Sequence, residues 1–353
     1  MVNVLGLDIG GANTKAAYVQ TQKDAITDVQ VLVEYFPVWK NSQNLGYVLQ
    51  KIKSAVGDEL DAVGITMTAE LSDVYQTKRE GVEHILGCVK EAFVDFPVYV
   101  LDTDAKLKLF KDALASPLEV AAANWVATGW LVSQYFENCI VVDVGSTSTS
   151  IIPVVNGKVA AQGRTDLDKL IYGELVYTGG LRTNLAAIVQ TVPVKGAVST
   201  VASELFALSG DIHLILGNIH SEQYICETAD GKGTTCREAF ARLARLVCAD
   251  TEMLTEKELT HIAQYIYEKQ IQQIVTGLNQ VHNLVKKAAL TKVPILIAGL
   301  GKNFLAQKAA EQIKADTIMD LGKLLPDKIS LAVPAVGVAL MTAKEWEKKN
   351  SDN

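Results

Sequence analysis

The chain has 353 residues, of which 49% are hydrophobic and 21% charged, and its formal net charge is −7. This composition excludes an intrinsically disordered chain, and the length leaves room for two domains with real cores. The acidic balance, with no basic run beyond Lys348 and Lys349, excludes an extended surface for nucleic acid or anionic membranes.

The first half of the chain alternates predicted strands and helices, which are distinguished by apolar runs of strand composition and by helical periodicity. The first three strands form a predicted meander. The predicted strands are Val2–Ile9, Thr14–Val19, Val29–Pro37, Asp61–Thr66 and Val98–Leu101, and the predicted helices are Leu45–Val56, Gly81–Phe93 and Pro117–Phe136.

The pattern then begins again. Cys139–Asp143, Thr149–Val155 and Lys158–Ala161 predict a second three-strand meander, with a hairpin turn at Asn156-Gly157. The Gly- and Thr-rich segment Gly163–Pro193 is too long for an ordinary connection, which predicts an insertion or a functional loop. The later predictions are helices at Val198–Ser209, Arg237–Ala249 and Glu256–Ala289, a strand at Pro294–Ala298, and helices at Lys302–Ala315 and Ser330–Ala343.

This repetition predicts two α/β domains. We expect the first over residues 1–137, with a helix at about 330–345 packing back on it, and the second over 138–329 with an insertion at about 163–235.

Each meander contains the same short motif, an apolar strand that ends in Asp and is followed by Gly and small polar residues. The two copies are Leu5–Lys15 and Val141–Ser150. Glycines let backbone N–H groups approach phosphate oxygens, hydroxyls add donors, and Asp8 with Asp143 could hold Mg²⁺. We therefore expect an anion between the two turns. The predicted phosphate-binding residues are Gly10, Gly11, Asn13, Thr14, Gly145, Ser146, Thr147, Ser148 and Thr149, and the predicted catalytic residues are Asp8, Asp143 and Lys15.

Two further segments are candidates for ligand contact. Gly299, Gly301 and Lys302 form a glycine turn at a helix start, which suits a nucleotide or another anion and is equally typical of close packing at a strand-to-helix corner. Gly163–Asn184 is a predicted substrate-contact segment and lid, because its composition suits ligand contact better than core filling. The candidate substrate-contact residues in this segment are Arg164, Asp166, Glu174, Tyr177 and Arg182, and Asp230 in a later Asp-Gly turn is a further candidate. Surface ion pairs or turn formation would explain the same residues.

Targeting and cysteine signals are weak. The N-terminus lacks the regions of a secretory signal, so we expect a cytoplasmic protein. Val120–Phe136 is too polar for a membrane span and is read as a buried helix. The five cysteines are scattered and odd in number, which favours free thiols, and the Cys and His residues between 213 and 248 lack the paired spacing of a zinc site. Their role stays open.

Longer strings resemble a known family. Two meanders with D-x-G turns and a late A-G-L-G turn resemble the superfamily of actin, sugar kinases and heat-shock ATPases, which implies a duplicated actin-like (ribonuclease H-like) ATPase fold with a central cleft. LGLDIGGANTK, VDVGSTSTSIIP, GELVYTGGLRTN, TADG, REAFARLARLVCAD and AGLGKNFL resemble the hydantoinase A/oxoprolinase-related family of tetrahydromethanopterin-linked C1 transfer pathway proteins, over nearly the whole chain.

That resemblance implies a transferase of methanofuran biosynthesis. Such a transferase joins a furan-methylamine diphosphate to the phenol oxygen of a tyrosine or tyramine derivative and releases pyrophosphate. The resemblance also implies Mg²⁺ as cofactor and these two small molecules as partners. Hydantoinase-type second turns usually continue with Asp where this chain has Ser150, so we expect no catalytic or metal role at that position.

Two other functions remain open at this point. An ATP-dependent small-molecule kinase or amide-ring hydrolase would use the same turns with ATP, and a non-catalytic nucleotide-binding protein would bind without turnover. The sequence also leaves open the acceptor, the general base and the oligomeric state, a homo-oligomer included.

Overall fold

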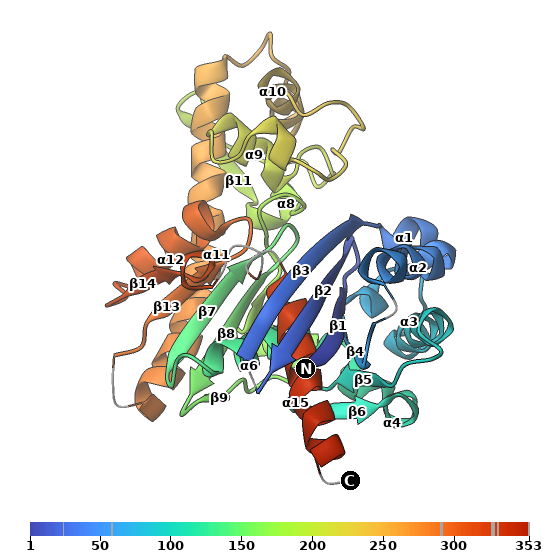
Figure 1. Cartoon of the computed structure of the whole chain (residues 1–353). Helices are drawn as coiled ribbons and strands as arrows, with labels where there is room; N and C mark the ends of the chain where they lie inside the picture. The colour runs from blue at the N-terminus through green and yellow to red at the C-terminus, as the bar shows by residue number, and fades with distance from the viewer. Residues whose placement is uncertain (24, 58, 290–291, 326–328, 330–331, 352–353) are drawn as a thin grey trace. The chain divides into compact units, whose positions relative to one another are not determined.

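The computed structural model describes residues 1–23, 25–57, 59–289, 292–325, 329 and 332–351 (Figure 1). The chain divides into two compact units. Unit 1 comprises Met1–Asn138, Val154–Asp168 and Leu321–Asn353, and unit 2 comprises Cys139–Pro153 and Lys169–Asp320.

Unit 1 is built on a six-stranded sheet with the order β3-β2-β1-β4-β5-β6. β1 pairs antiparallel with β2 and parallel with β4, and β4 pairs parallel with β5. The strands are β1 Val2–Ile9, β2 Asn13–Gln22, β3 Ala25–Tyr35, β4 Ala62–Met67, β5 Val98–Leu101 and β6 Leu107–Leu109.

Helices cover both faces of this sheet. Alternate residues of β1 point to opposite faces, so Leu5 and Leu7 enter a core with α2 and α3, whereas Gly6 faces α15. A Cβ on Gly6 would lie 2.0 Å from the carbonyl oxygen of Ala335, so glycine is what allows α15 to approach. The helices are α1 Val38–Asn41, η1 Ser42–Asn44, α2 Leu45–Val56, η2 Ala69–Leu71, α3 Lys78–Ala92, α4 Phe110–Ala115, α5 Pro117–Val120, α6 Asn124–Ser133, α13 Leu321–Leu324 and α15 Val333–Ser351.

Unit 2 repeats the same plan with the order β10-β8-β7-β13-β14. β7 lies beside β8 and pairs parallel with β13, which pairs parallel with β14. In unit 1, β1 likewise lies beside β2 and pairs parallel with β4, which pairs parallel with β5. The predicted duplicated actin-like α/β fold is therefore confirmed. The strands are β7 Cys139–Val144, β8 Thr149–Val155, β10 Leu175–Val176, β13 Ile295–Ala298 and β14 Ile318–Asp320, and β9 Lys158–Val159 pairs with β8 through the predicted Asn156-Gly157 turn.

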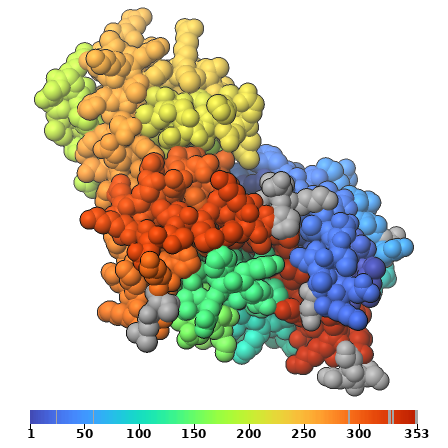
Figure 2. Space-filling model, turned by 60° about the vertical axis from the view of Figure 1, so that its left-hand side comes forward, coloured from blue at the N-terminus to red at the C-terminus, as the bar shows by residue number. Residues whose placement is uncertain are grey.

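The insertion of unit 2 has its own core. Apolar side chains of α8, α9, α10 and the first half of α11 pack together, and the yellow and orange surfaces of this part of the chain lie side by side in Figure 2. The elements from the insertion to the end of the unit are α7 Asp166–Ile171, α8 Leu185–Ile188, β11 Thr191–Val194, β12 Ala197–Thr200, α9 Ser209–Ile215, η3 Ser221–Gln223, α10 Cys236–Arg245, α11 Glu256–Ala289, the π-helical turn η4 Lys302–Ala306 and α12 Gln307–Gln312.

Three helix predictions need correction. Pro117–Phe136 is two helices, because the chain leaves helical geometry at Ala121 and Ala122 has a φ of 53°. Val198–Ser209 is not a helix: β11 and β12 form a hairpin around Lys195 and Gly196, which both have positive φ, and α9 begins only at Ser209. The helix predicted from Lys302 ends at Gln312, and Ser330, the predicted start of the last helix, lies outside the described residues.

Candidate functional site

The first D-x-G turn closes the β1–β2 hairpin. The Gly10 N–H donates to the carbonyl oxygen of Asn13 at 3.0 Å, and a Cβ on Gly10 would lie 2.8 Å from that oxygen. Asp8 is almost fully buried at the end of β1 and faces Lys15 in the antiparallel register. The turn brings the predicted carboxylate and amine onto neighbouring strands, while Thr14 is fully buried in β2.

The second turn has the same geometry. The Gly145 N–H donates to the carbonyl oxygen of Ser148 at 2.9 Å, which matches the bond from Gly10 to Asn13 three residues on. Asp143 lies in β7 opposite Ala298 of β13. The two sequence copies are thus two copies of one backbone structure.

Residues 179–182 pack directly on the second turn. The N–H of Gly180 donates to Gly145, and those of Leu181 and Arg182 donate to Ser146, at 2.9 to 3.0 Å. A Cβ on Gly179 would lie 2.6 Å from the backbone of Thr147, so no larger residue fits there. These bonds use carbonyl oxygens of the turn and bring the Arg182 guanidinium 3.4 Å from the Thr147 hydroxyl.

A buried polar network holds residues 178–183 in place. The Gln270 side chain, fully buried on α11, donates to the Thr178 hydroxyl at 3.0 Å and to the carbonyl oxygen of Gly179 at 2.9 Å. Its own oxygen lies 3.0 Å from Nε2 of His213, whose pKa burial lowers to about 3. His213 is therefore neutral at working pH and acts as a fixed hydrogen-bonding group.

Three other predicted residues of unit 2 have different environments. Thr149 is buried, and its hydroxyl donates to the carbonyl oxygen of Thr178 at 2.8 Å. Glu174 is buried, with its backbone paired to Ile151 and Lys169, whereas Tyr177 is exposed. Arg182 is thus the predicted lid residue that the structure brings to the turn.

Arg164 and Asp166, predicted in the same lid, belong to unit 1. Arg164 pairs with Asp104 at 3.0 Å on the surface. Asp166 starts α7 and pairs with Lys78 at 2.7 Å, and Lys78 also lies 3.8 Å from Glu70. Glu70 and Lys78 were missed from the sequence, although Glu70 follows the carboxyl end of a buried parallel strand, where ligand sites of α/β sheets concentrate.

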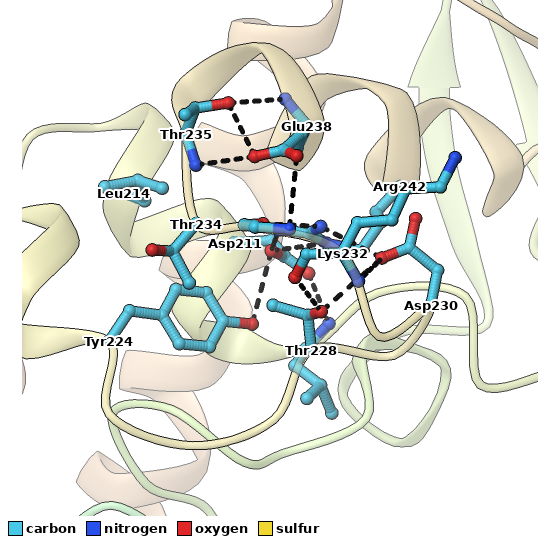
Figure 3. A network of polar contacts seen from close by, with 12 residues as sticks. Asp211, Leu214, Tyr224, Thr228, Asp230, Lys232, Thr234, Thr235, Glu238 and Arg242 are labelled. Atoms are coloured by element: carbon cyan, nitrogen blue, oxygen red, sulfur yellow. Dashed lines mark hydrogen bonds and ion pairs between the residues drawn. The ribbon is translucent and has the colours of Figure 1, made fainter.

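Asp230 is part of a polar network in the insertion (Figure 3). The fully buried Arg242 guanidinium binds Asp211 through two nitrogens at 2.7 and 2.9 Å and Asp230 at 3.1 Å. Arg245 binds the other oxygen of Asp230 at 3.1 Å, and the Tyr224 hydroxyl donates to Asp211 at 3.2 Å. In this structure Asp230 anchors the 228–235 loop to α10.

The glycine turn at 299–301 packs on β7. Gly299 has a φ of 82°, and a Cβ there would lie 2.4 Å from both Oδ1 of Asp143 and the carbonyl oxygen of Val144. The Gly301 N–H donates to Val144 at 3.0 Å, and Lys302 pairs with Asp320 at 2.8 Å. Close packing of Gly299 against Asp143 and of Gly301 against the Val144 side chain accounts for the glycines of this turn.

We predict that Gly299→Ala displaces Asp143 and destabilises the fold by more than the strain of its φ alone, which is on the order of 1–3 kcal/mol. Gly217→Ala is the matched control, since Gly217 has a φ of 68° with no atom within 4 Å of an added Cβ. Urea unfolding of both variants measures the difference. Equal losses would mean that the approach to Asp143 is not restrictive.

Within the described residues, no group of three or more His, Cys, Asp or Glu side chains is arranged to hold a metal ion. The five cysteines are all free thiols, and burial raises the pKa of Cys226 to about 11. No described helix has the length and apolar character that crossing a membrane requires.

The chain is similar to known proteins over nearly its full length. It is 37% identical over 98% of its length to the (4-{4-[2-(gamma-L-glutamylamino)ethyl]phenoxymethyl}furan-2-yl)methanamine synthase of Methanocaldococcus jannaschii, 99% of which is covered. It is 36% identical over 62% of its length to the synthase of the same name from Methanococcus vannielii, 97% of which is covered.

One solved structure shares the fold, and one family model matches most of the chain. A nucleotide-free structure of acetone carboxylase superposes with a TM-score of 0.53 at 9% identity, covering 96% of this chain and 70% of that one. The sequence model of the hydantoinase/oxoprolinase family matches residues 61–345. The chain belongs to the hydantoinase/oxoprolinase family.

Proposed function

We propose that the chain is an aryl-ether synthase that joins a furan-methanamine diphosphate to the phenol oxygen of a tyramine derivative. The observation that carries this proposal is the 37% identity, over almost the whole of both chains, to a synthase whose named product contains a phenoxymethylfuran. Such an ether forms when the furanylmethyl carbon loses its bond to diphosphate and gains one to the phenol oxygen, which loses its proton.

The diphosphate would bind at the second turn. Residues 179–182 use the carbonyl oxygens of this turn, which leaves the N–H groups and hydroxyls of Ser146, Thr147 and Ser148 as donors to phosphate oxygens. The Arg182 guanidinium, 3.4 Å from the Thr147 hydroxyl, adds a cation that can bind a phosphate through two nitrogens. The matching first turn, with Gly10, Gly11 and Asn13, would serve phosphate in the same way, and Lys15 would add a positive charge.

Mg²⁺ fits the carboxylates of these turns. Each turn supplies one Asp, Asp8 at the end of β1 and Asp143 in β7, and Mg²⁺ is usually held by one or two carboxylates with phosphate oxygens and water. When bound, Mg²⁺ would neutralise charge on the departing diphosphate. Asp143 would hold it at the second turn, where turn N–H groups and Arg182 orient the leaving group for displacement, and Asp8 would serve an ion at the first turn in the same way.

The experiment offers the purified protein two phosphate donors in the presence of Mg²⁺. With the furan-methanamine diphosphate and γ-glutamyltyramine we expect equal amounts of ether and pyrophosphate, measured by mass spectrometry and a coupled pyrophosphate assay. With ATP and a sugar or a hydantoin we expect no phosphate release. Turnover of ATP together with inertness toward the furan diphosphate would contradict the proposal and support a kinase or amide-ring hydrolase.

A further inference from the structure

Glu70 is a buried carboxylate beside the first turn. It lies in η2, directly after β4, and 1% of its surface is exposed. The segment that carries it follows the turn closely: the Thr68 N–H donates to the carbonyl oxygen of Ile9 at 3.0 Å, and a Cβ on Gly11 would lie 3.5 Å from the Ser72 hydroxyl. Glu70 is therefore fixed to the same piece of backbone as the Asp8 turn.

Gly81 brings α3 against this segment. A Cβ on Gly81 would lie 2.6 Å from the carbonyl oxygen of Glu70, so glycine is needed for the contact. The approach places Lys78, in the first turn of α3, over the carboxylate. Lys78 Nζ lies 3.8 Å from Oε1 of Glu70 and 2.7 Å from Oδ2 of Asp166.

The three charged groups run from the surface to the interior. The side chains of Asp166 and Lys78 are 21% and 25% exposed, whereas that of Glu70 is fully buried. No hydrogen bond of ordinary geometry reaches either Glu70 oxygen within the described part of the chain, and its polar surroundings are the Lys78 ammonium at 3.8 Å and the backbone N–H groups of Glu70 and Ala122. A buried carboxylate with a distant cation and only weak backbone contacts is costly for folding, which favours a functional reason for it.

The surroundings make Glu70 a proton acceptor near neutral pH. Burial raises its pKa to about 7, the positive charge of Lys78 opposes this rise, and the negative charge of Asp166 adds to it. Tyr75 also lies near Glu70, and burial raises its pKa to about 12, so it stays neutral. Glu70 is thus poised to gain or lose a proton, as catalytic acids and bases are.

We propose that Lys78 and Glu70 together take the proton from the phenol of the acceptor, Lys78 as the group that touches the phenol and Glu70 as the buried acceptor behind it. This inference rests on the proposed function and names its general base. The phenolic O–H bond breaks and an N–H bond forms on Lys78, while one of the three N–H bonds of its ammonium breaks and an O–H bond forms on Glu70. The phenolate is then free to attack the furanylmethyl carbon.

The proton affinities of the partners suit such a relay. A phenol and a lysine ammonium have similar reference pKa values, about 10, so the transfer between them is nearly balanced. Glu70 is the final proton acceptor, and the ion pair with Asp166 holds the Lys78 ammonium in place. Because Glu70 must be ionised to accept, kcat should rise with pH through a pKa near 7.

The experiment compares the wild type with Glu70→Gln and Lys78→Arg in pyrophosphate release. Gln keeps the shape of Glu without accepting a proton, and Arg keeps the charge beside Asp166 without giving up a proton at working pH. We expect each to lower kcat by roughly 10²- to 10⁴-fold, the usual effect of losing a general base, with KM for the furan diphosphate unchanged. Glu70→Gln should also remove the rise of kcat near pH 7.

A second readout separates proton transfer from a structural role. Acceptors with fluorinated, more acidic phenols need less help from a base. In both variants, kcat with such an acceptor should therefore be at least 10-fold higher than kcat with the unsubstituted phenol. The matched control is Lys51→Arg, which alters an exposed 2.7 Å ion pair with Glu34 in the same unit and should leave kcat and its pH profile unchanged. Since burial penalises the ionised Glu70, Glu70→Gln should melt no lower than the wild type at pH 8.

The outcomes are distinct. A wild type that releases no pyrophosphate refutes the proposed function itself. An active wild type with a fully active Glu70→Gln or Lys78→Arg variant refutes the relay alone, and so does a loss of rate that acidic phenols do not relieve. If Glu70→Gln fails to fold, Lys78→Arg decides by the same criteria.

Discussion

Asp143→Asn should reduce pyrophosphate release by roughly 10²- to 10⁴-fold while leaving the fold intact, the range that loss of a group stabilising developing charge commonly produces. Asn keeps the size of the side chain against Gly299, where space is tightest, and removes the negative charge that would hold Mg²⁺. The measurement is kcat at saturating Mg²⁺ together with the Mg²⁺ concentration at half-maximal rate.

Its control is Glu311→Gln on α12, which removes an exposed carboxylate paired with Lys308 in the same unit and should leave the rate unchanged. If Asp143→Asn turned over substrate at the wild-type rate, Asp143 would have no part in the mechanism.

Arg242→Met should destabilise unit 2 by about 3–5 kcal/mol, because it leaves Asp211 buried without its cation. Both side chains are fully buried, and the guanidinium donates two hydrogen bonds to one carboxylate oxygen (Figure 3). Urea unfolding followed by circular dichroism measures the loss. Asp211→Asn combined with Arg242→Met should recover part of it, since no uncompensated charge then remains.

Arg245→Met is the matched control for this prediction. Arg245 is one turn further along α10 and binds the same Asp230, but its side chain is 38% exposed, so water replaces the lost contact. We expect a loss below about 1 kcal/mol. Equal losses for the two arginines would show that burial does not govern the strength of this network.

The strand framework could be predicted from sequence because local signals and tertiary structure agree there. The apolar run of β1 ends at the turn predicted from Gly10, and Asn156-Gly157 makes the predicted hairpin between β8 and β9. The insertion was less predictable. Its Lys195-Gly196 turn is a weaker hairpin signal than Asn-Gly, and Ala122 adopts positive φ although alanine favours helix.

In the candidate site, the sequence predicted the backbone shape of the turns better than the partners of the charged side chains. The two turns show the same hydrogen bond, as their repeated glycines predicted, and Arg182 lies at the second turn. The ion-pair partner of a charged side chain depends on tertiary neighbours that the sequence does not reveal. Asp230 pairs with Arg242, and Asp166 pairs with Lys78. Glu70 carries no motif of its own, and only its burial beside the first turn sets it apart.

In the proposed mechanism the second turn binds the diphosphate of the substrate. A crystal structure with Mg²⁺ and pyrophosphate tests it most directly. We expect pyrophosphate density against the N–H groups of Ser146 to Ser148 and the Arg182 guanidinium. Density at the Gly299–Gly301 turn instead, with residues 145–148 empty, would contradict it.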